Sequence, residues 1–295
     1  MDEREALSML AATLPGAGDD AAVIDGTVVS TDMLHETTDF PEGTTRHTAG
    51  WRSVGASLSD VAAMGAEATA AVAAYGAPTL DREEIEAFVE GARAVCEAVG
   101  ARYVGGDLDE HGEFTAATTA LGAVGEPVYR SGATPGDAVC VTGTLGRTGA
   151  AIRRFRDGDA ERGNELFRFQ PRVAAGRALA GRASAMLDSS DGLARSVHQL
   201  AAASDCGIAL SWDALPVDDS VAAVATDDDD RRELAAFFGE DFELVCTVPD
   251  AELAAAREAC PVALTRVGEV VAADEGVTAD GDPLPDRGYV HGDGE

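Results

Sequence analysis

The sequence predicts an α/β protein built from two domains. Its 295 residues are 45% hydrophobic, which is enough to bury two cores of ordinary size. In both halves of the chain, short runs rich in alanine and valine alternate with longer amphipathic segments, as strands and helices do. The stretch "RSGATPGD" (130–137) lies between the two series and is rich in turn residues. We therefore expect one domain over residues 1–133 and a second over 134–295.

The first half begins with an expected helix over residues 3–13. The strands "AAVI" (21–24) and "VVST" (28–31) follow and are joined by the turn Asp25-Gly26. The strongest helix signal spans residues 80–99, where Asp81 is a suitable N-cap and Gly100 follows the last turn. Its apolar residues fall on one face at helical spacing. The other expected elements of this half are a helix over 48–64 and strands over 68–77, 101–106 and 114–125.

The second half alternates in the same way. It starts with the strand "AVCVTG" (138–143) and the glycine-spaced loop "GTLGRTG" (143–149), which opens a helix. In the arginine-rich stretch that follows (153–182), we expect the arginines to pair with nearby acids. The other expected elements are strands over 184–187, 207–212, 242–248 and 262–271 and a helix that begins at Gly192. No run approaches about 20 continuous apolar residues, so we expect no membrane span.

The charge balance is strongly acidic, with 53 Asp and Glu against 22 basic residues and a formal net charge of -31. Every basic residue is arginine, which excludes the P-loop, protein-kinase and Schiff-base chemistries that need a lysine. Such a surface is typical of proteins from salt-loving cells, where salt screens the self-repulsion. The start "MDEREALSML" is unlike a signal peptide, so we expect a cytoplasmic protein. We expect no nucleic-acid or membrane partner, because this field repels polyphosphate unless cations intervene.

The five cysteines and five histidines show no spacing typical of a zinc site. Most of the cysteines lie in apolar runs such as "AVCVTG" and "ELVCTV". We expect them to be small core residues.

Because acids are so abundant, their sequence context must separate functional carboxylates from surface charges. Six stretches place Asp or Glu among glycine, serine and apolar residues: "GAGDDAAVI" (16–24), "VVSTDML" (28–34), "ASLSDVAAMGA" (56–66), "RYVGGDL" (102–108), "MLDSSDGLA" (186–194) and "FGEDFEL" (238–244). Each alone has a plain interpretation as a turn, a polar helix edge or an N-cap. At least four of them end a strand or enter a loop, where α/β folds gather ligand sites. Together they predict a metal site.

Short carboxylate side chains suit Mg²⁺, which commonly bridges protein carboxylates to substrate phosphates. In a chain without lysine, the phosphates of ATP must be met by Mg²⁺ and arginine, and Arg130 is the best placed arginine. Two points stay open. The glycines of "GTLGRTG" either bring backbone N–H groups near a phosphate or form a tight turn. Ser190 or Asp191 either caps the helix after Gly192 or belongs to the metal site, and these two roles can coexist.

In this order, the motifs resemble the thiamine-monophosphate kinase family, part of the superfamily that includes aminoimidazole ribonucleotide synthetase. The similar motifs are "GAGDDAAV", "STDML", "LSDVAAMGA", "GGD", "RSGATPGD", "VTGTLG", "DSSDGLA" and "GEDFEL". The resemblance implies an aminoimidazole ribonucleotide synthetase-like architecture: an N-terminal sheet domain that pairs in a homodimer, and a C-terminal α/β domain. ATP and thiamine monophosphate would meet between the domains. The γ-phosphoryl group of ATP would pass directly, in line, to thiamine monophosphate.

The resemblance also implies roles for individual residues. The implied Mg²⁺ ligands are Asp20, Ser30, Thr31, Asp32, Asp60, Asp107, Asp188 and Asp191. The implied nucleotide contacts are Gly106, Asp107, Arg130 and Ser190. The implied contacts of thiamine phosphate are Asp39, Glu240 and Tyr289. The expected catalytic residues among these are Asp107, Arg130, Asp188 and Asp191.

At Asp39 the chain departs from the family pattern. It reads "TDF" (38–40) where many members carry "NHF" or "VHF", so an acid replaces the expected substrate-contacting histidine. An acid is electrostatically compatible with a cationic thiazolium ring. The alternatives that stay open are an aminoimidazole ribonucleotide synthetase-like enzyme, a catalytically silent nucleotide sensor and a metal-dependent phosphatase. The selenophosphate-synthesising and hydrogenase-maturation relatives are disfavoured, because they need a cysteine near one end of the chain.

Overall fold

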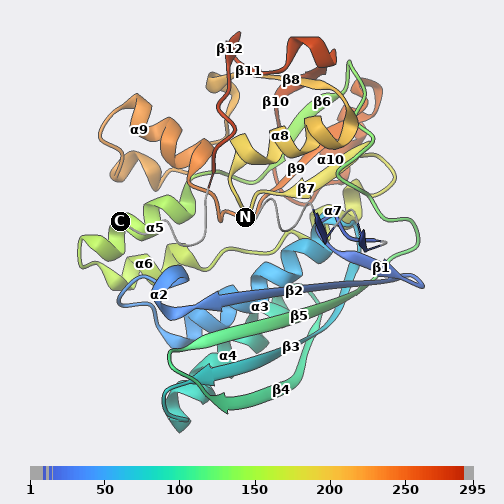
Figure 1. Cartoon of the computed structure of the whole chain (residues 1–295). Helices are drawn as coiled ribbons and strands as arrows, with labels where there is room; N and C mark the ends of the chain where they lie inside the picture. The colour runs from blue at the N-terminus through green and yellow to red at the C-terminus, as the bar shows by residue number, and fades with distance from the viewer. Residues whose placement is uncertain (1–8, 11–12, 15, 289–295) are drawn as a thin grey trace.

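The computed structural model describes residues 9–10, 13–14 and 16–288, and within them the chain forms two β-sheets (Figure 1). Most of the helix expected over residues 3–13 lies outside the described residues. Helix α3 (Arg46–Ala63) lies between the sheets and contacts strands of both. The molecule is therefore a mixed α/β fold.

The N-terminal sheet has the strand order β1-β2-β5-β3-β4. Its strands are β1 (Ala22–Ile24), β2 (Thr27–His35), β3 (Glu67–Ala77), β4 (Arg102–Glu110) and β5 (Thr115–Ala123). The turn Asp25-Gly26 joins β1 to β2, and both residues have the positive φ angles, 50° and 77°, of a tight hairpin turn. This hairpin confirms the prediction.

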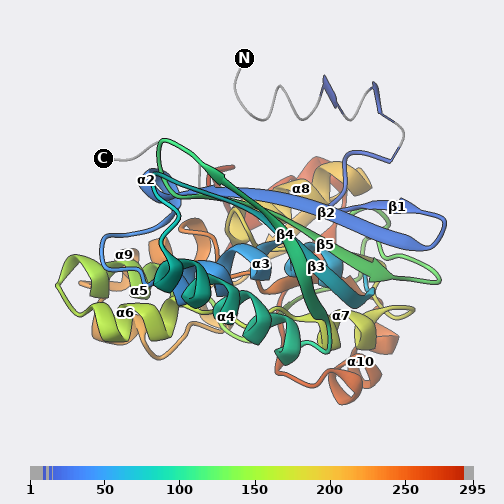
Figure 2. The same ribbon diagram turned by 90° about the horizontal axis from the view of Figure 1, so that it is seen from below.

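Helices α3 and α4 (Arg82–Ala98) pack on one face of this sheet (Figure 2). As predicted, the Asp81 side chain caps α4 by accepting from the backbone N–H groups of Glu83 and Glu84. The two helix backbones come very close, since a Cβ atom added to Gly91 would lie 1.9 Å from the His47 carbonyl oxygen. A short helix, α2 (Glu36–Asp39), follows β2.

The C-terminal sheet has the strand order β12-β11-β8-β10-β6-β9-β7. Its strands are β6 (Ala138–Thr142), β7 (Ala185–Asp188), β8 (Gly207–Leu210), β9 (Leu244–Val248), β10 (Leu264–Val271), β11 (Val277–Ala279) and β12 (Asp282–Pro283). Its helices are α5 (Arg147–Arg156), α6 (Ala160–Phe167), α7 (Val173–Leu179), α8 (Leu193–Ser204), α9 (Asp228–Arg232) and α10 (Leu253–Ala259). The short elements that we did not predict include β11, β12 and α10.

The arginine-rich stretch 153–182 becomes the end of α5, then α6 and α7. Four of its arginines pair with acids, as expected: Arg153 with Asp230, Arg162 with Glu165, Arg172 with Glu243 and Arg177 with Glu67. Strand β9 begins two residues later than predicted. The reason is local, because Glu240 and Phe242 have φ angles of 59° and 53°, which a strand cannot contain.

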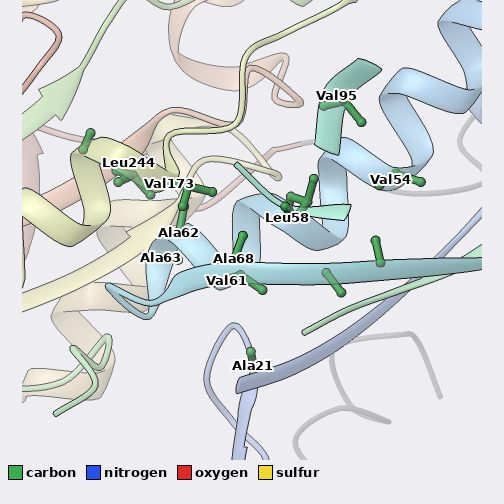
Figure 3. Packing of buried hydrophobic residues seen from close by; sticks show 14 of the residues in the cluster. Ala21, Val54, Leu58, Val61, Ala62, Ala63, Ala68, Val95, Val173 and Leu244 are labelled. Atoms are coloured by element: carbon green, nitrogen blue, oxygen red, sulfur yellow. The ribbon is translucent and has the colours of Figure 1, made fainter. Parts of the chain in front are cut away.

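The largest core joins the two parts of the chain around α3 (Figure 3). Leu58 and Val61 of α3 are fully buried, and Val173 of α7 and Leu244 of β9 belong to the same cluster. All five cysteines are buried and free, which confirms that they are core residues.

The other face of the N-terminal sheet exposes apolar side chains. In β2 the odd-numbered residues point to this face, and Met33 is 58% exposed. Leu121 of β5 lies on the same face by strand register and is 36% exposed.

Candidate active site

Three carboxylates converge where α3 meets the loop before β1 and the end of β7. Asp20, Asp60 and Asp188 each offer an oxygen, and these oxygens all lie within 4.8 Å of one another. Asp188 is 1% exposed. We call these three residues the carboxylate cluster.

Burial and mutual repulsion make the carboxylate cluster unstable as bare charge. Burial raises the pKa of Asp188 and raises those of Asp20 and Asp60 well above the usual range. The charges of Asp32, Asp188 and Asp20 raise the pKa of Asp60 further. Within the described residues, Oδ2 of Asp20 and Oδ2 of Asp188 are buried without a hydrogen-bond partner. Unpaired buried carboxylate oxygens at this spacing fit a divalent cation such as Mg²⁺.

Strand β2 adds polar groups on the side that faces α3. The Ser30 hydroxyl donates to Oδ2 of Asp60. The Ser57 hydroxyl donates to Oδ2 of Asp32, at 2.7 Å. Ser30 and Asp32 share this face because strand residues two apart point the same way.

Arg130 brings a positive charge to one side of the carboxylate cluster. Its Nη2 lies 3.3 Å from Oδ1 of Asp20, and its Nε lies 3.6 Å from Oδ1 of Asp19. Its backbone N–H also donates to Oδ2 of Asp19, at 3.2 Å. The charge of Arg130 opposes the rise in the pKa of Asp20. Arg130 therefore neutralises only part of the negative charge.

The loop after β7 is closed by backbone contacts. The N–H of Ser190 donates to Oδ1 of Asp188, at 3.2 Å, and the Ser190 carbonyl accepts from the N–H of Glu240, at 2.6 Å. Gly192 takes the N-cap position of α8. The position that we expected for Ser190 or Asp191 thus belongs to glycine, whose positive φ of 97° closes the turn. Ser190 and Asp191 lie beside the carboxylate cluster in sequence, in the loop that leaves it.

Two predicted ligand positions lie elsewhere in the N-terminal sheet. Thr31 points to the exposed face, where its hydroxyl hydrogen-bonds that of Thr119, at 2.9 Å. Asp107 lies on β4, three strands from β2, so about 14 Å separates it laterally from that strand. Strand register aligns Asp107 with Ala74, Ala117 and Met33, which puts it on the exposed face. Its neighbour Gly106 lies on the same edge strand.

Of the three predicted substrate contacts, the structure describes Glu240 and Asp39. Glu240 is buried and forms an ion pair with Arg52, with 3.0 Å between Oε2 and Nη2. Oδ2 of Asp39 accepts from the backbone N–H of His35, at 2.6 Å, and from the hydroxyl of Thr38, at 2.8 Å. Tyr289 lies outside the described residues.

The structure also decides between the two interpretations of "GTLGRTG". The N–H groups of Gly146 and Thr148 donate to the Asp241 carboxylate, at 2.5 Å and 2.9 Å. Burial raises the pKa of Asp241 to about 7. The loop is therefore a tight turn whose N–H groups are already used, and Asp241 occupies the start of α5.

Sequence reasoning did not single out three polar residues of α3. Arg52 holds Glu240, and Ser57 binds Asp32. Within the described residues, the hydroxyl of Ser59 is buried without a hydrogen-bond partner. All three are fully buried. The signal was present, because "WRSVGASLSD" carries one arginine and three serines on a helix that is otherwise small and apolar.

Among the described residues, helices long and apolar enough to cross a membrane are absent. Two family models match the chain. One, described as AIR synthase related protein, N-terminal domain, matches residues 18–124, and the other, AIR synthase related protein, C-terminal domain, matches residues 134–280.

Curated relatives resemble the chain over nearly all of its length. A thiamine-monophosphate kinase from Halobacterium salinarum is 61% identical, over 99% of this chain and 100% of the relative. A thiamine-monophosphate kinase from Methanospirillum hungatei is 40% identical, over 99% of both chains.

Solved structures agree with these relatives. Thiamine-monophosphate kinase from Stenotrophomonas maltophilia superposes with a TM-score of 0.81 at 31% identity, covering 94% of both chains. The structure of AaThiL complexed with AMPPCP and TMP superposes with a TM-score of 0.87 at 25% identity, covering 98% of this chain and 96% of that one.

Proposed function

The chain belongs to the thiamine-monophosphate kinase family, and we propose that it phosphorylates thiamine monophosphate by a direct, in-line, Mg²⁺-assisted transfer from ATP. The reaction is ATP-dependent phosphorylation of thiamine monophosphate, which yields thiamine diphosphate and ADP. Its similarity to AaThiL, solved with AMPPCP and TMP, supports this assignment. The alternative of an aminoimidazole ribonucleotide synthetase-like enzyme is not favoured, because relatives that match over the full length are thiamine-monophosphate kinases.

The observation that carries the proposed mechanism is the carboxylate cluster. Asp20, Asp60 and Asp188 would hold Mg²⁺, whose charge would offset the phosphate charge that develops during phosphoryl transfer. Asp32, bound by Ser57, lies close enough to raise the pKa of Asp60 and would complete the acidic side of the site.

The residues around the carboxylate cluster position the two substrates in this proposal. The guanidinium group of Arg130 would bind a nucleotide phosphate as well as Asp20. Ser190 would contact the nucleotide from the loop that follows Asp188. Asp191 belongs to the same loop and would serve as a further ligand. An acceptor phosphate is already ionised, so the transfer needs no general base. Positioning and neutralisation of charge then supply most of the catalysis.

We also propose that the protein acts as a homodimer that covers the exposed face of the N-terminal sheet. Met33 and Leu121 lie on that face, and Asp107 lies there too, about 14 Å from its own β2. A second subunit would bury the apolar side chains. In the dimer, Asp107 and Gly106 of one subunit would approach the nucleotide of the other, and Thr31 would approach its metal. Within a single chain these residues lie away from the carboxylate cluster.

The acidic composition and the relative from Halobacterium salinarum support a further part of the proposal, a cytoplasm of high salt as the working environment. We retain residues 1–133 and 134–295 as the proposed domains. Asp39, Glu240 and Tyr289 remain proposed contacts of thiamine phosphate. Of these, Glu240 would act while paired with Arg52.

Product analysis tests the proposed function. The protein is incubated in molar KCl with Mg²⁺, ATP and thiamine monophosphate, and parallel reactions omit the acceptor or contain EDTA. We expect thiamine diphosphate to form in step with ADP and EDTA to abolish both. ADP without thiamine diphosphate would point to another acceptor, free phosphate would point to a phosphatase, and no turnover at any salt concentration would favour a nucleotide sensor.

Single substitutions test whether the carboxylate cluster is needed for turnover. Asp188→Asn should reduce turnover by at least about a hundredfold, because it removes a charged ligand at the site of phosphoryl transfer. The matched control is Asp274→Asn, which removes an exposed acid from the turn after β10 and should leave turnover unchanged. Equal activity of both variants would contradict the proposed site.

Sedimentation tests the homodimer. Met33→Glu places a charge on the exposed sheet face and should shift the protein toward monomer, with a loss of turnover if the partner supplies Asp107. An unchanged sedimentation coefficient would remove the support for this interface.

A further inference from the structure

A polar cavity lies beside a pair of stacked rings. Phe169 and Phe242 stack with their centroids 4.2 Å apart and pack against Ala56 in the middle of α3. Toward the start of α3, Trp51 lines a cavity of about 350 Å³. Trp51 and Asp60 are nine residues apart, or about 13 Å along the helix axis. The Trp51 end of the cavity is therefore distant from the carboxylate cluster, whereas its Glu243 end approaches it, since the backbone N–H of Glu243 donates to the hydroxyl of Ser189, the neighbour of Asp188.

Two of the acids in the cavity wall already have partners. Arg172 binds Glu243 with both Nε and Nη2, and the Nε contact to Oε2 measures 2.7 Å. Asp241 is held by the backbone N–H groups at the start of α5. A third acid, Glu165, pairs with Arg162, which is not part of the wall, at 2.5 Å.

Two arginines of the cavity wall form no ion pair, although the charges of both lower the pKa of Glu165 and that of Arg147 also lowers the pKa of Asp218. Arg147 donates Nε to the Leu166 carbonyl, at 2.9 Å, and Nη2 to the Glu165 carbonyl, at 3.1 Å. Arg168 donates Nη1 to the hydroxyl of Thr48, at 3.1 Å. In the part of the chain that the structure describes, neither arginine forms an ion pair with a carboxylate. In a protein of net charge -31, the wall of this cavity carries as many arginines as acids, three of each.

We propose that this cavity binds an oxyanion of the phosphate class, held by Arg147 and Arg168. Nη1 of Arg147 and both Nε and Nη2 of Arg168 are not used in the hydrogen bonds above, and planar guanidinium groups suit phosphate oxygens. The volume matches the lower end of small-ligand pockets. Trp51 forms a wall of fixed orientation, because its indole N–H donates to the Phe169 carbonyl, at 2.6 Å.

Tryptophan fluorescence tests this site without relying on activity. The chain has two tryptophans, and Trp212→Phe leaves Trp51 as the only one. This variant is titrated with inorganic phosphate at constant ionic strength in KCl, with EDTA present so that no divalent cation recruits phosphate to the carboxylate cluster. We expect a saturable change in Trp51 emission that chloride does not produce.

Two substitutions in the same background identify the ligands. Arg147→Gln and Arg168→Gln should each weaken phosphate binding by at least about tenfold, because each removes a charged hydrogen bond. The control Arg156→Gln removes an exposed arginine from α5 and should bind as the parent does. Circular dichroism confirms that each variant is folded, and either arginine variant alone is sufficient for the test.

The source of the oxyanion is distinguished by a parallel titration with thiamine monophosphate. Binding of both ligands, with equal losses in the arginine variants, assigns a site for any phosphate group. Binding of the ester alone, lost in the same variants, assigns a site for the phosphorylated substrate. No saturable change with either ligand, an equal change with chloride, or parent-like binding by both arginine variants would overturn the proposal.

Discussion

Replacing Asp60 by asparagine should stabilise the metal-free protein. Asp60 is half-buried, and the charges of Asp20, Asp32 and Asp188 all raise its pKa. Among the described residues, its favourable partner is the hydroxyl of Ser30, which an asparagine oxygen can still accept. The substitution therefore removes repulsion and keeps the hydrogen bond. Asp20→Asn should gain less, because it also takes a partner from Arg130.

The size of the effect follows from two limits. At a separation of 4.8 Å and an effective dielectric constant of about 20, two carboxylates repel by about 3.5 kcal/mol. Protonation caps the cost, because the interval from an unfolded pKa of about 3.9 to pH 7 corresponds to about 4 kcal/mol. We expect Asp60→Asn to raise the free energy of unfolding by about 1 to 3 kcal/mol at pH 7 in EDTA.

The pH dependence has a definite sign. The folded-state pKa of Asp60 lies above its unfolded value, so the folded state binds the proton more tightly. The cost of the ionised carboxyl is absent below about pH 4 and grows as the pH rises toward the folded pKa. The advantage of Asp60→Asn over the parent should therefore vanish near pH 4.

Urea unfolding at fixed KCl measures the stability of the protein with the site metal-free and with Mg²⁺ present. In EDTA the variant should be the more stable protein, whereas Mg²⁺ at about a hundred times its dissociation constant should add about 2.7 kcal/mol to the parent and much less to the variant. Asp274→Asn serves as the control for a change of net charge. A variant less stable than the parent in EDTA, or equal stabilisation of both by Mg²⁺, would refute the electrostatic reasoning.

Three further substitutions test other parts of the structure. Arg52→Met should cost about 3 to 5 kcal/mol of stability because it leaves Glu240 as an unpaired buried charge, and adding Glu240→Gln should restore part of that loss in urea unfolding. Asp241→Ala should cost about 1 to 3 kcal/mol because two N–H groups at the start of α5 lose their acceptor; an unchanged unfolding midpoint would argue against this cap. Gly106→Ala should lower both stability and turnover, since its Cβ would lie 1.7 Å from the Ala73 carbonyl oxygen; parent-like values of kcat and KM for ATP would show that β4 can adjust.

The elements that the sequence determined by itself are those governed by near neighbours. Helix α4 has its cap, its apolar face and its terminal glycine within one continuous segment, and the β1–β2 hairpin follows from Asp25-Gly26. The order of the motifs was sufficient to indicate the family, and the six acidic stretches with the absence of lysine predict a metal site. These features need no knowledge of which distant segments meet.

Only the tertiary structure decided which acids meet. Asp20, Asp60 and Asp188 converge because α3 is buried between two sheets and carries Asp60 to the end of β7. Thr31 and Asp107 stand in equally suggestive motifs, yet strand alternation and strand order place both on the exposed face of the sheet. Turn, cap and helix preferences act over a few residues. The distance between two carboxylates from remote segments depends instead on sheet order, strand register and the packing of one shared helix.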